Sequence, residues 1–450
     1  YAHCELLIVG GGAAGLQAAS TAAQTGVRVI IADEQHELGG WLLTDNNFNI
    51  DEKPALNWVH DTVKKLKSAP NVTCLNRTTV FAKMDDNFTI MAERVTEHLS
   101  RPFEHLPKQR LWKIRAKKVI LATGAIERPL VFSGNDLPGI MLSSAIRSYI
   151  KRYDVLPGTR AIIFTNNDDA YFTALAIYEA GGFVRCIVDL RENPKSQIIT
   201  TIRKLGINVR TGHAVIAARG SRHVASVDIA AYDIETQAPT SSISHMDCNL
   251  LAMSGGLNPV VHLHSQRKGK LTWDHRTSCY RPDNGSNEWV SVGSANGTFQ
   301  LKKALNEATK ATTITISKLL NENEKCKIKE TNSGPNSEEK QQNWAPTPAW
   351  LIQSAQPHIS NKTAFVDFQN DSTALDIKLA VREGYHSIEH VKRYTTTGMA
   401  TDQGKTSNIN AIGILADSLD KSIAQTGITT FRPPCTPTSL GLIAGRNIGS

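Results

Sequence analysis

Three glycines near the N-terminus have the spacing of a dinucleotide-binding loop. Gly10, Gly12 and Gly15 form G-x-G-x-x-G between an apolar segment, residues 6–9, and an alanine-rich segment that ends at Gly26. The first glycine permits a tight turn, the second lets the backbone approach a pyrophosphate, and the third lets helix and strand pack closely. We expect the N–H groups that begin the helix to face the phosphates.

An acidic residue follows the next predicted strand, residues 27–32, where such a unit holds a ribose. Asp33 lies twenty-three residues after Gly10 and is placed to accept a hydrogen bond from a ribose hydroxyl, with Glu34 as the alternative. Without an adjacent arginine, Asp33 favours a free hydroxyl, hence NAD or FAD over NADP. A tight strand–helix turn that binds nothing is the structural alternative.

Two later turns are expected at the same site. In KKVILATGAIERP, residues 117–129, a predicted strand runs into Thr123 and Gly124, a turn similar to the one that closes the nucleotide domain of two-dinucleotide flavoprotein reductases. In WVSVGSANG, Ser294 stands where those reductases carry the aspartate that holds the flavin ribityl chain, which favours NAD over flavin. The residues expected at the dinucleotide are Gly10, Gly12, Ala13, Ala14, Gly15, Asp33, Glu34, Gly40, Thr123, Gly124, Gly293 and Ser294.

A second strand–turn–helix–strand unit has lost its glycines. RAIIF, residues 160–164, and FVRCIVDLR, residues 183–191, predict strands around a helix, but the loop between them reads TNNDDA, residues 165–170. The side chains of Asn166 to Asp169 add bulk, and the two aspartates should repel a phosphate. We expect a retained scaffold without a mobile nicotinamide site, while a modified site for another nucleotide stays open.

The amino-acid composition limits the kinds of partner that we expect. The chain of 450 residues has 40% hydrophobic and 20% charged residues, which is typical of a soluble globular protein. The net charge of +8 is not gathered into a basic block, and no apolar run reaches the roughly 18 residues of a membrane helix, so we expect neither nucleic acid nor membrane. Seven scattered cysteines without a CxxC pair suggest a reducing compartment, the cytoplasm, and no metal site.

Three stretches carry a family resemblance: residues 254–274, 366–408 and 426–437. They resemble the α subunit of heterotetrameric sarcosine oxidase, and opine oxidase and dye-linked proline dehydrogenase subunits are similar in layout. The chain starts without methionine and lacks the family's N-terminal ferredoxin-like and C-terminal folate-binding domains, so we expect a central fragment. The resemblance implies oxidative demethylation of a secondary amine, with no catalytic residue in this chain.

The same resemblance implies the cofactors and partners. NAD would be bound tightly in this chain, FMN at the interface with a β subunit, and FAD within that β subunit, where the amine is oxidised; further small subunits would complete the oxidase. Two other classes stay open: a self-contained FAD-dependent pyridine-nucleotide oxidoreductase, and a non-catalytic NAD-binding scaffold. The missing CxxC, the TNNDDA loop and Ser294 speak against the first of these.

The C-terminal region resembles the small iron–sulfur domain of bacterioferritin-associated ferredoxins without its cysteines. Asp367, Gln369 and Asp402 stand near the positions of cluster thiolates, so we expect a plain helical domain. GKTSN, residues 404–408, begins a predicted helix and could cradle the FMN phosphate, or it is a helix cap with a solvated lysine. The residues expected at the phosphate are Arg393, Thr396, Lys405, Thr406 and Ser407.

These observations predict an α/β fold with two Rossmann-like dinucleotide-binding units of the two-dinucleotide flavoprotein reductase type, followed by the small helical domain. The expected segments are a first unit at 1–150, a second unit at 151–255, a return to the first unit at 256–320, a linker or surface loop at 321–350, and the helical domain, with the FMN and the partner interface, at 351–450.

Overall fold

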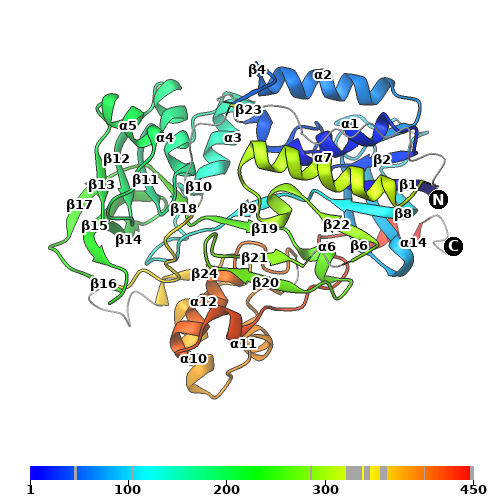
Figure 1. Ribbon diagram of the computed structural model, residues 1–450. Coiled ribbons are helices and arrows are strands. Elements are labelled where there is room, and N and C mark those ends of the chain that lie inside the picture. The colour runs from blue at the N-terminus through cyan, green and yellow to red at the C-terminus, as the bar shows by residue number, and fades with distance from the viewer. Residues whose placement is uncertain are drawn as a thin grey trace.

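Two sheets, each with helices against it, and a small helical region make up the described part of the chain (Figure 1). The computed structural model describes residues 1–44, 48–103, 105–283, 286–320, 337–338, 345–354, 362–399 and 401–445. In the described residues no helix combines the length and the apolar character that a bilayer crossing requires.

The first sheet has the strand order β5-β2-β1-β8-β7-β6, and β22 also pairs with β8. Its strands are β1 (Ala2–Val9), β2 (Val29–Ala32), β5 (Val72–Leu75), β6 (Thr78–Lys83), β7 (Phe88–Arg94), β8 (Gln109–Leu121) and β22 (Trp289–Ser291). The strands β5, β2, β1, β8 and β22 pair in parallel, whereas β7 and β6 extend the sheet antiparallel. The C-terminal ends of the parallel strands therefore meet at one edge, where nucleotides bind in such folds.

Three helices cover this sheet: α1 (Ala13–Ala23), α2 (Ala55–Ser68) and α7 (Leu301–Ser317) (Figure 1). In α2 the residues Trp58, Val59, Thr62 and Leu66 are buried, which is the three- and four-residue spacing of one helix face. Near the same core lie η1 (Gly40–Leu43), β3 (Asn49–Ile50), β4 (Lys53–Pro54) and β23 (Ser337–Glu338), while η2 (Asp85–Asn87) joins β6 to β7.

The second sheet is parallel throughout, in the order β10-β18-β11-β12-β13. Its strands are β10 (Ile140–Leu142), β11 (Arg160–Thr165), β12 (Phe183–Asp189), β13 (Val209–Thr211) and β18 (Leu250–Ser254), with helices α3 (Ser143–Tyr153), α4 (Asp169–Glu179) and α5 (Gln197–Lys204). Beside it lie β14 (His213–Gly220), β15 (Val224–Asp233), β16 (Ala238–Pro239) and β17 (Ser244–Asp247). Since β10 belongs to this sheet, the second unit takes in residues before 151.

A two-stranded ribbon of β9 (Ala125–Glu127) and β19 (Leu257–Pro259) joins the two units. After it come α6 (His262–Ser265), β20 (Leu271–Asp274) and β21 (Cys279–Pro282). The chain then returns to the first sheet through β22, η3 (Gly293–Asn296) and α7.

The C-terminal region contains β24 (Phe365–Asp367), β25 (Ser372–Thr373), α10 (Ala374–Arg382), α11 (Ile388–Thr395), α12 (Asn408–Ser418), α13 (Ile423–Thr426) and α14 (Leu440–Ala444). Thr373 and Asp376 form a capping box that begins α10. Trp350, which the expected linker included, is buried in this core, whereas most of 321–350 lies outside the described residues. The predicted fold class is confirmed: two Rossmann-like units of the reductase type and a helical C-terminal region.

Candidate dinucleotide-binding site

At two positions of the first glycine loop, a residue with a side chain would overlap neighbouring backbone atoms. Gly10 has φ +102°, and a Cβ there would overlap the carbonyl oxygen of Ala122. A Cβ on Gly15 would overlap the Gly10 carbonyl, at the point where α1 crosses the loop. These two glycines let the end of β1, the start of α1 and the end of β8 meet closely.

Gly12 is different, because the protein itself leaves room beside it. Its φ is −74°, and the nearest atom to a Cβ at this position would be the Gly40 Cα, 3.9 Å away. Gly12 is the N-cap of α1 and no side chain caps this helix, so backbone N–H groups of the first turn face the open space, with Ala13 and Ala14 in that turn. The loop therefore offers a phosphate both space and donors, and a pyrophosphate fits this cradle.

Gly40 forms the opposite wall of the cradle. It has φ +55°, and a Cβ there would approach the Gly12 Cα to 2.8 Å. The neighbouring Gly39 N–H donates to the Gly11 carbonyl oxygen at 2.8 Å, which holds the two segments together. A side chain at either Gly12 or Gly40 would fill the gap between them.

Asp33, the residue expected to bind the ribose, is hydrogen-bonded to the glycine loop. One of its carboxylate oxygens accepts the Gly11 N–H at 2.6 Å and the other accepts the Gln35 N–H at 2.7 Å. Burial raises the pKa of Asp33, and these two hydrogen bonds oppose that rise. Each oxygen keeps a second lone pair for a ribose hydroxyl. Glu34, the alternative, is held through its backbone, because its carbonyl oxygen accepts from the Arg94 guanidinium at 2.8 Å.

The turn after β22 lies against α1 through Gly293. This glycine has φ +64°, and a Cβ there would lie 2.7 Å from the Ala14 Cβ. Glu307 of α7 accepts the Gly293 N–H at 2.8 Å and the Asn296 amide at 2.5 Å. Ser294 is half-buried beside them. Sequence reasoning missed Glu307, which belongs to no motif and is recognised only through these bonds.

The turn after β8 is held from the opposite side. The Thr123 hydroxyl donates to the Val260 carbonyl oxygen at 2.8 Å, and the Val260 N–H donates to the Gly124 carbonyl oxygen at 2.9 Å. Gly124 has φ +74° with open space beside it. The Thr123 side chain thus holds the turn in place, and Gly124 has no side chain to fill the space beside it.

The corresponding loop of the second unit is closed by its own side chains. Asn166 donates to the Thr347 carbonyl oxygen at 2.7 Å, and Asn167 donates to the Ser254 hydroxyl at 3.0 Å. All four residues from Asn166 to Asp169 are 3% exposed or less. The space that a phosphate would need between β11 and α4 is occupied by protein.

Both aspartates of this loop form ion pairs with arginines. The expected repulsion of a phosphate by two uncompensated charges is therefore wrong. Asp168 forms an ion pair with Arg191 at 2.7 Å, and Asp169 forms one with Arg147 at 2.8 Å. Burial alone would lower the pKa of Arg191, but hydrogen bonds and charges of Asp189 and Asp168 raise it. The loop is closed to a phosphate by the bulk of its side chains and by their hydrogen bonds within the protein.

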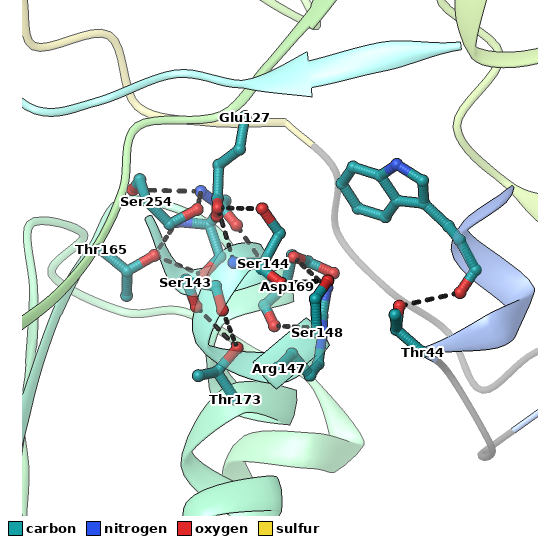
Figure 2. Close-up of polar contacts among 12 residues, drawn as sticks. Thr44, Glu127, Ser143, Ser144, Arg147, Ser148, Thr165, Asp169, Thr173 and Ser254 are labelled. Atoms are coloured by element: carbon teal, nitrogen blue, oxygen red, sulfur yellow. Dashed lines mark hydrogen bonds and ion pairs between the residues drawn. The ribbon is translucent and has the colours of Figure 1, made fainter. Parts of the chain in front are cut away.

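Figure 2 shows a buried carboxyl where β9 meets α3. Glu127 accepts the Ser144 N–H at 2.7 Å and the Ser144 hydroxyl at 2.6 Å, at the start of α3. Burial, and then the charge of Asp169, raise the pKa of Glu127 to about 7. The second unit is thus attached to the connecting ribbon through a carboxyl whose protonation changes near neutral pH.

Three of the residues expected at an FMN phosphate have hydrogen-bond partners within the chain. Ser407 is buried and donates to Asp367 at 3.2 Å, and Arg393 binds its own helix through the Glu389 carbonyl oxygen at 3.1 Å. Thr396 ends α11 with φ +60° and donates to the Thr395 carbonyl oxygen. Lys405 and Thr406 are half-buried in the loop before α12.

Asp367 accepts several of the hydrogen bonds that hold these loops together. Its carboxylate also accepts the Gly398 N–H at 2.6 Å and the Gln369 N–H at 2.9 Å. Asp402 similarly accepts the Gly404 N–H at 2.8 Å. Carboxylates that bind backbone N–H groups therefore organise the loops in which a thiolate-ligated cluster would require cysteines.

Together, the fold and its loops define a protein of the two-dinucleotide flavoprotein reductase architecture. A family model described as pyridine nucleotide-disulphide oxidoreductase matches residues 4–161. Thioredoxin reductase from T. acidophilum has the same fold, with a TM-score of 0.54 and 18% identity over 70% of this chain and 98% of that chain.

Over all of its residues the chain is similar to sarcosine oxidase alpha subunits, which confirms the predicted resemblance. It is 42% identical over 451 residues to the alpha subunit from Rhizobium meliloti (strain 1021), and 37% identical over 455 residues to the one from Corynebacterium sp. (strain U-96). A model described as sarcosine oxidase A3 domain matches residues 361–446. The chain spans 43% and 46% of the length of these two relatives, less than half in each case.

Two further proteins are similar over nearly the whole chain. An opine oxidase subunit from Rhizobium meliloti (strain 1021) is 22% identical, covering 98% of this chain and 98% of that protein. L-Proline dehydrogenase from P. horikoshii has the same fold, with a TM-score of 0.70 and 18% identity over 98% of this chain and 80% of that chain.

Proposed function

We propose that this chain binds NAD at the first dinucleotide loop, within a flavin-dependent amine oxidase of the sarcosine oxidase type. The observation that carries this proposal is the contrast between the two loops. Gly12 and Gly40 leave an open cradle at the start of α1, whereas Asn166 and Asn167 fill the equivalent loop of the second unit. A flavoprotein reductase needs both loops open, but a protein that receives electrons from a partner flavin needs only the first.

Residues of this chain would hold the dinucleotide in a fixed pose. The N–H groups at the start of α1 would bind the pyrophosphate, and Asp33 would accept from the adenosine ribose. Nicotinamide cofactors supply hydride transfer chemistry, but we assign NAD a structural role because no second cofactor can dock on the closed loop. Ser294 favours NAD at this site, and FAD is the alternative occupant.

We assign the chemistry to other subunits. FAD in one of these partners would oxidise sarcosine to glycine, with formaldehyde or methylenetetrahydrofolate as the one-carbon product and hydrogen peroxide as the product of oxygen. FMN at the interface, with its phosphate near Lys405 and Thr406, would receive the electrons. No residue of this chain would be catalytic, and we place the oxidase in the cytoplasm.

Membership of an opine or proline dehydrogenase, or of another secondary-amine dehydrogenase, is the second candidate. The opine oxidase relative matches this chain over 98% of both lengths, whereas the sarcosine oxidase relatives are more than twice as long. The higher identity of 42% against 22% favours sarcosine.

The test is anaerobic flavin reduction in the complex that purifies with a tagged form of this chain. We expect sarcosine to bleach the flavin absorbance, and expect proline, an opine and NADPH to do so much more slowly. Reduction by an opine or by proline, but not by sarcosine, would favour the second candidate. Reduction of flavin in the isolated chain by NADPH would contradict both.

A further inference from the structure

A cavity of about 280 Å³ lies between α7 and β22, whose places in the first unit Figure 1 shows. Its other walls are Lys118 and Val119 near the end of β8 and the segment 286–288 that leads into β22. Pockets that enclose drug-sized ligands have roughly 300–1,000 Å³, so this cavity suits a smaller molecule. None of the residues expected at a cofactor lines it.

The helix α7 turns one face to the protein core and another to this cavity. Leu305, Ala308 and Ile316 are buried in the core of the first unit. The residues on the cavity face have the three- and four-residue spacing of a second helix face: Glu307, Lys310, Ala311, Ile314, Thr315 and Lys318. The outer face of a helix that covers a sheet is normally polar, so an isoleucine on this face needs an explanation.

The middle of the cavity is apolar. Val290 and Ala311 are partly buried and pack against the core of the first unit. Ile314, on the helix side, is 49% exposed. The Thr315 hydroxyl donates to the Ala311 carbonyl oxygen at 2.8 Å, so its polar group is satisfied within α7. Apolar surface that stays open in a concave site favours the apolar part of a ligand.

Asn287 holds two lysine side chains beside each other at the end of the cavity where α7 ends. Lys118 Nζ donates to the Asn287 carbonyl oxygen at 2.6 Å, and Lys318 Nζ donates to the Asn287 side-chain oxygen at 3.4 Å. Each ammonium group has three donors, so each keeps two for other acceptors. Two ammonium groups bound to neutral oxygens of one residue repel each other, and an anion between them would relieve this repulsion.

The lysines of the cavity have no acidic partner. The neighbouring Lys117 pairs with Glu5 at 3.8 Å. By contrast, Lys118, Lys310 and Lys318 form no ion pair among the described residues. Their charges are therefore available to a ligand.

Two glutamates also line the cavity, but both are engaged away from the lysine pair. Glu307 lies near the other end, where it accepts the Gly293 N–H at 2.8 Å and the Asn296 amide at 2.5 Å. Glu288 lies close to Lys83: burial, and then the charge of Arg267, lower the pKa of Lys83 to about 8, and the charge of Glu288 opposes this fall. The end of the cavity at Asn287 is thus positively charged.

We propose that this cavity binds an aliphatic carboxylate, with its carboxylate between Lys118 and Lys318 and its hydrocarbon chain along Val290, Ala311 and Ile314. Each carboxylate oxygen can accept from one ammonium group. From Lys318 back to Ala311 the helix rises by about 10 Å, at about 1.5 Å per residue, which matches a medium-length chain such as that of octanoate. This proposal rests on the cavity alone and does not depend on the cofactor in the first loop.

The test is isothermal titration of octanoate into the purified complex, with hexanoate and octanamide as comparison ligands. We expect octanoate to bind. Hexanoate should bind roughly tenfold more weakly, because two buried CH₂ groups are lost. Octanamide, which has the same chain but no charge, should also bind about tenfold more weakly or worse, because the charge-assisted hydrogen bonds are lost.

Four variants separate the contributions. Lys118→Gln and Lys318→Gln should each weaken octanoate binding about fivefold to tenfold and leave octanamide unaffected. Ile314→Ser should reduce the difference in affinity between octanoate and hexanoate. Lys303→Gln, on an exposed residue of α7 outside the cavity, is the matched control and should bind octanoate as the wild type does.

Three results would each overturn the assignment: no binding of octanoate to the wild-type complex, equal affinity for octanamide, or octanoate binding that neither lysine variant weakens. Should Lys118→Gln fail to fold, Lys318→Gln decides, since Lys318 is exposed. The NAD content of both lysine variants should equal that of the wild type. A failure of this proposal is therefore distinguishable from a failure of the dinucleotide assignment.

Discussion

The side-chain amide of Asn166 donates a 2.7 Å hydrogen bond to the carbonyl oxygen of Thr347. This bond ties the phosphate loop of the second unit to a segment nearly two hundred residues later in the chain. A nucleotide could enter only if this segment moved away and the buried Asn166 and Asn167 side chains left the loop. We therefore expect the second Rossmann-like unit to act as a structural support in this chain.

The closed loop predicts that NADPH does not reduce the enzyme. Mixing the oxidised complex with NADPH or NADH in a stopped-flow instrument should leave the flavin spectrum unchanged over the time in which the amine substrate reduces it. Rapid bleaching by either nucleotide would show that the loop opens in solution.

Arg191 should be essential for the stability of the second unit. Replacing it with alanine leaves Asp168 and Asp189 buried without their cation, so Arg191→Ala should lower the free energy of unfolding by roughly 3–5 kcal/mol. The exposed Arg382→Ala is the matched control, expected to change it by less than about 0.5 kcal/mol. Urea titration of both variants measures the difference, and equal effects would mean that the buried cluster is not coupled to stability.

Glu127 should make stability depend on pH. Its pKa of about 7 in the fold lies above its ordinary value of 4.5, so between these values the folded state binds more protons and the free energy of unfolding falls as the pH rises. The full effect is roughly 3 kcal/mol, since one pKa unit corresponds to about 1.4 kcal/mol.

Glu127→Gln mimics the protonated carboxyl and removes this dependence. Relative to the wild type, the variant should gain stability steadily from about pH 4.5 to pH 8, when urea denaturation of both proteins is measured at each pH. A constant difference between the two proteins across this range would show that Glu127 is ionised normally.

Lys405→Glu should reduce FMN content without unfolding the chain. The substitution places a negative charge at the loop where a phosphate needs a positive one, and a charge-assisted contact of this kind is worth roughly 1.5–3 kcal/mol. We expect a complex with normal NAD and FAD but less FMN, when the three are quantified separately after denaturation. Lys421→Glu, on the exposed end of the same domain, is a control that should keep its FMN.

The first unit could be predicted from sequence because each of its elements has a local signal. The glycine spacing, the flanking apolar segments and Asp33 all lie between residues 6 and 33, and the structure places them around one loop. The second unit could be recognised for the same reason, although its phosphate loop lacks the glycines that mark such a loop.

What the sequence could not show depends on contacts between distant segments. The neutralisation of Asp168 and Asp169 requires Arg191 and Arg147, which lie on other elements and carry no motif. The position of Trp350 in the helical core, rather than on a surface linker, likewise depends on α12, where Gly413 makes room for the indole.

The most direct test of the account is to identify and count the nucleotide that the chain releases on denaturation. Wild-type protein should release close to one NAD per chain. Gly12→Val should release none, and it should melt close to the temperature of wild-type protein stripped of its nucleotide, because the new side chain enters only the open cradle. Gly15→Ala, which would overlap the Gly10 carbonyl, should instead lower the melting temperature. Release of FAD or of no nucleotide by the wild type, or unchanged NAD in Gly12→Val, would contradict the assignment of the first loop.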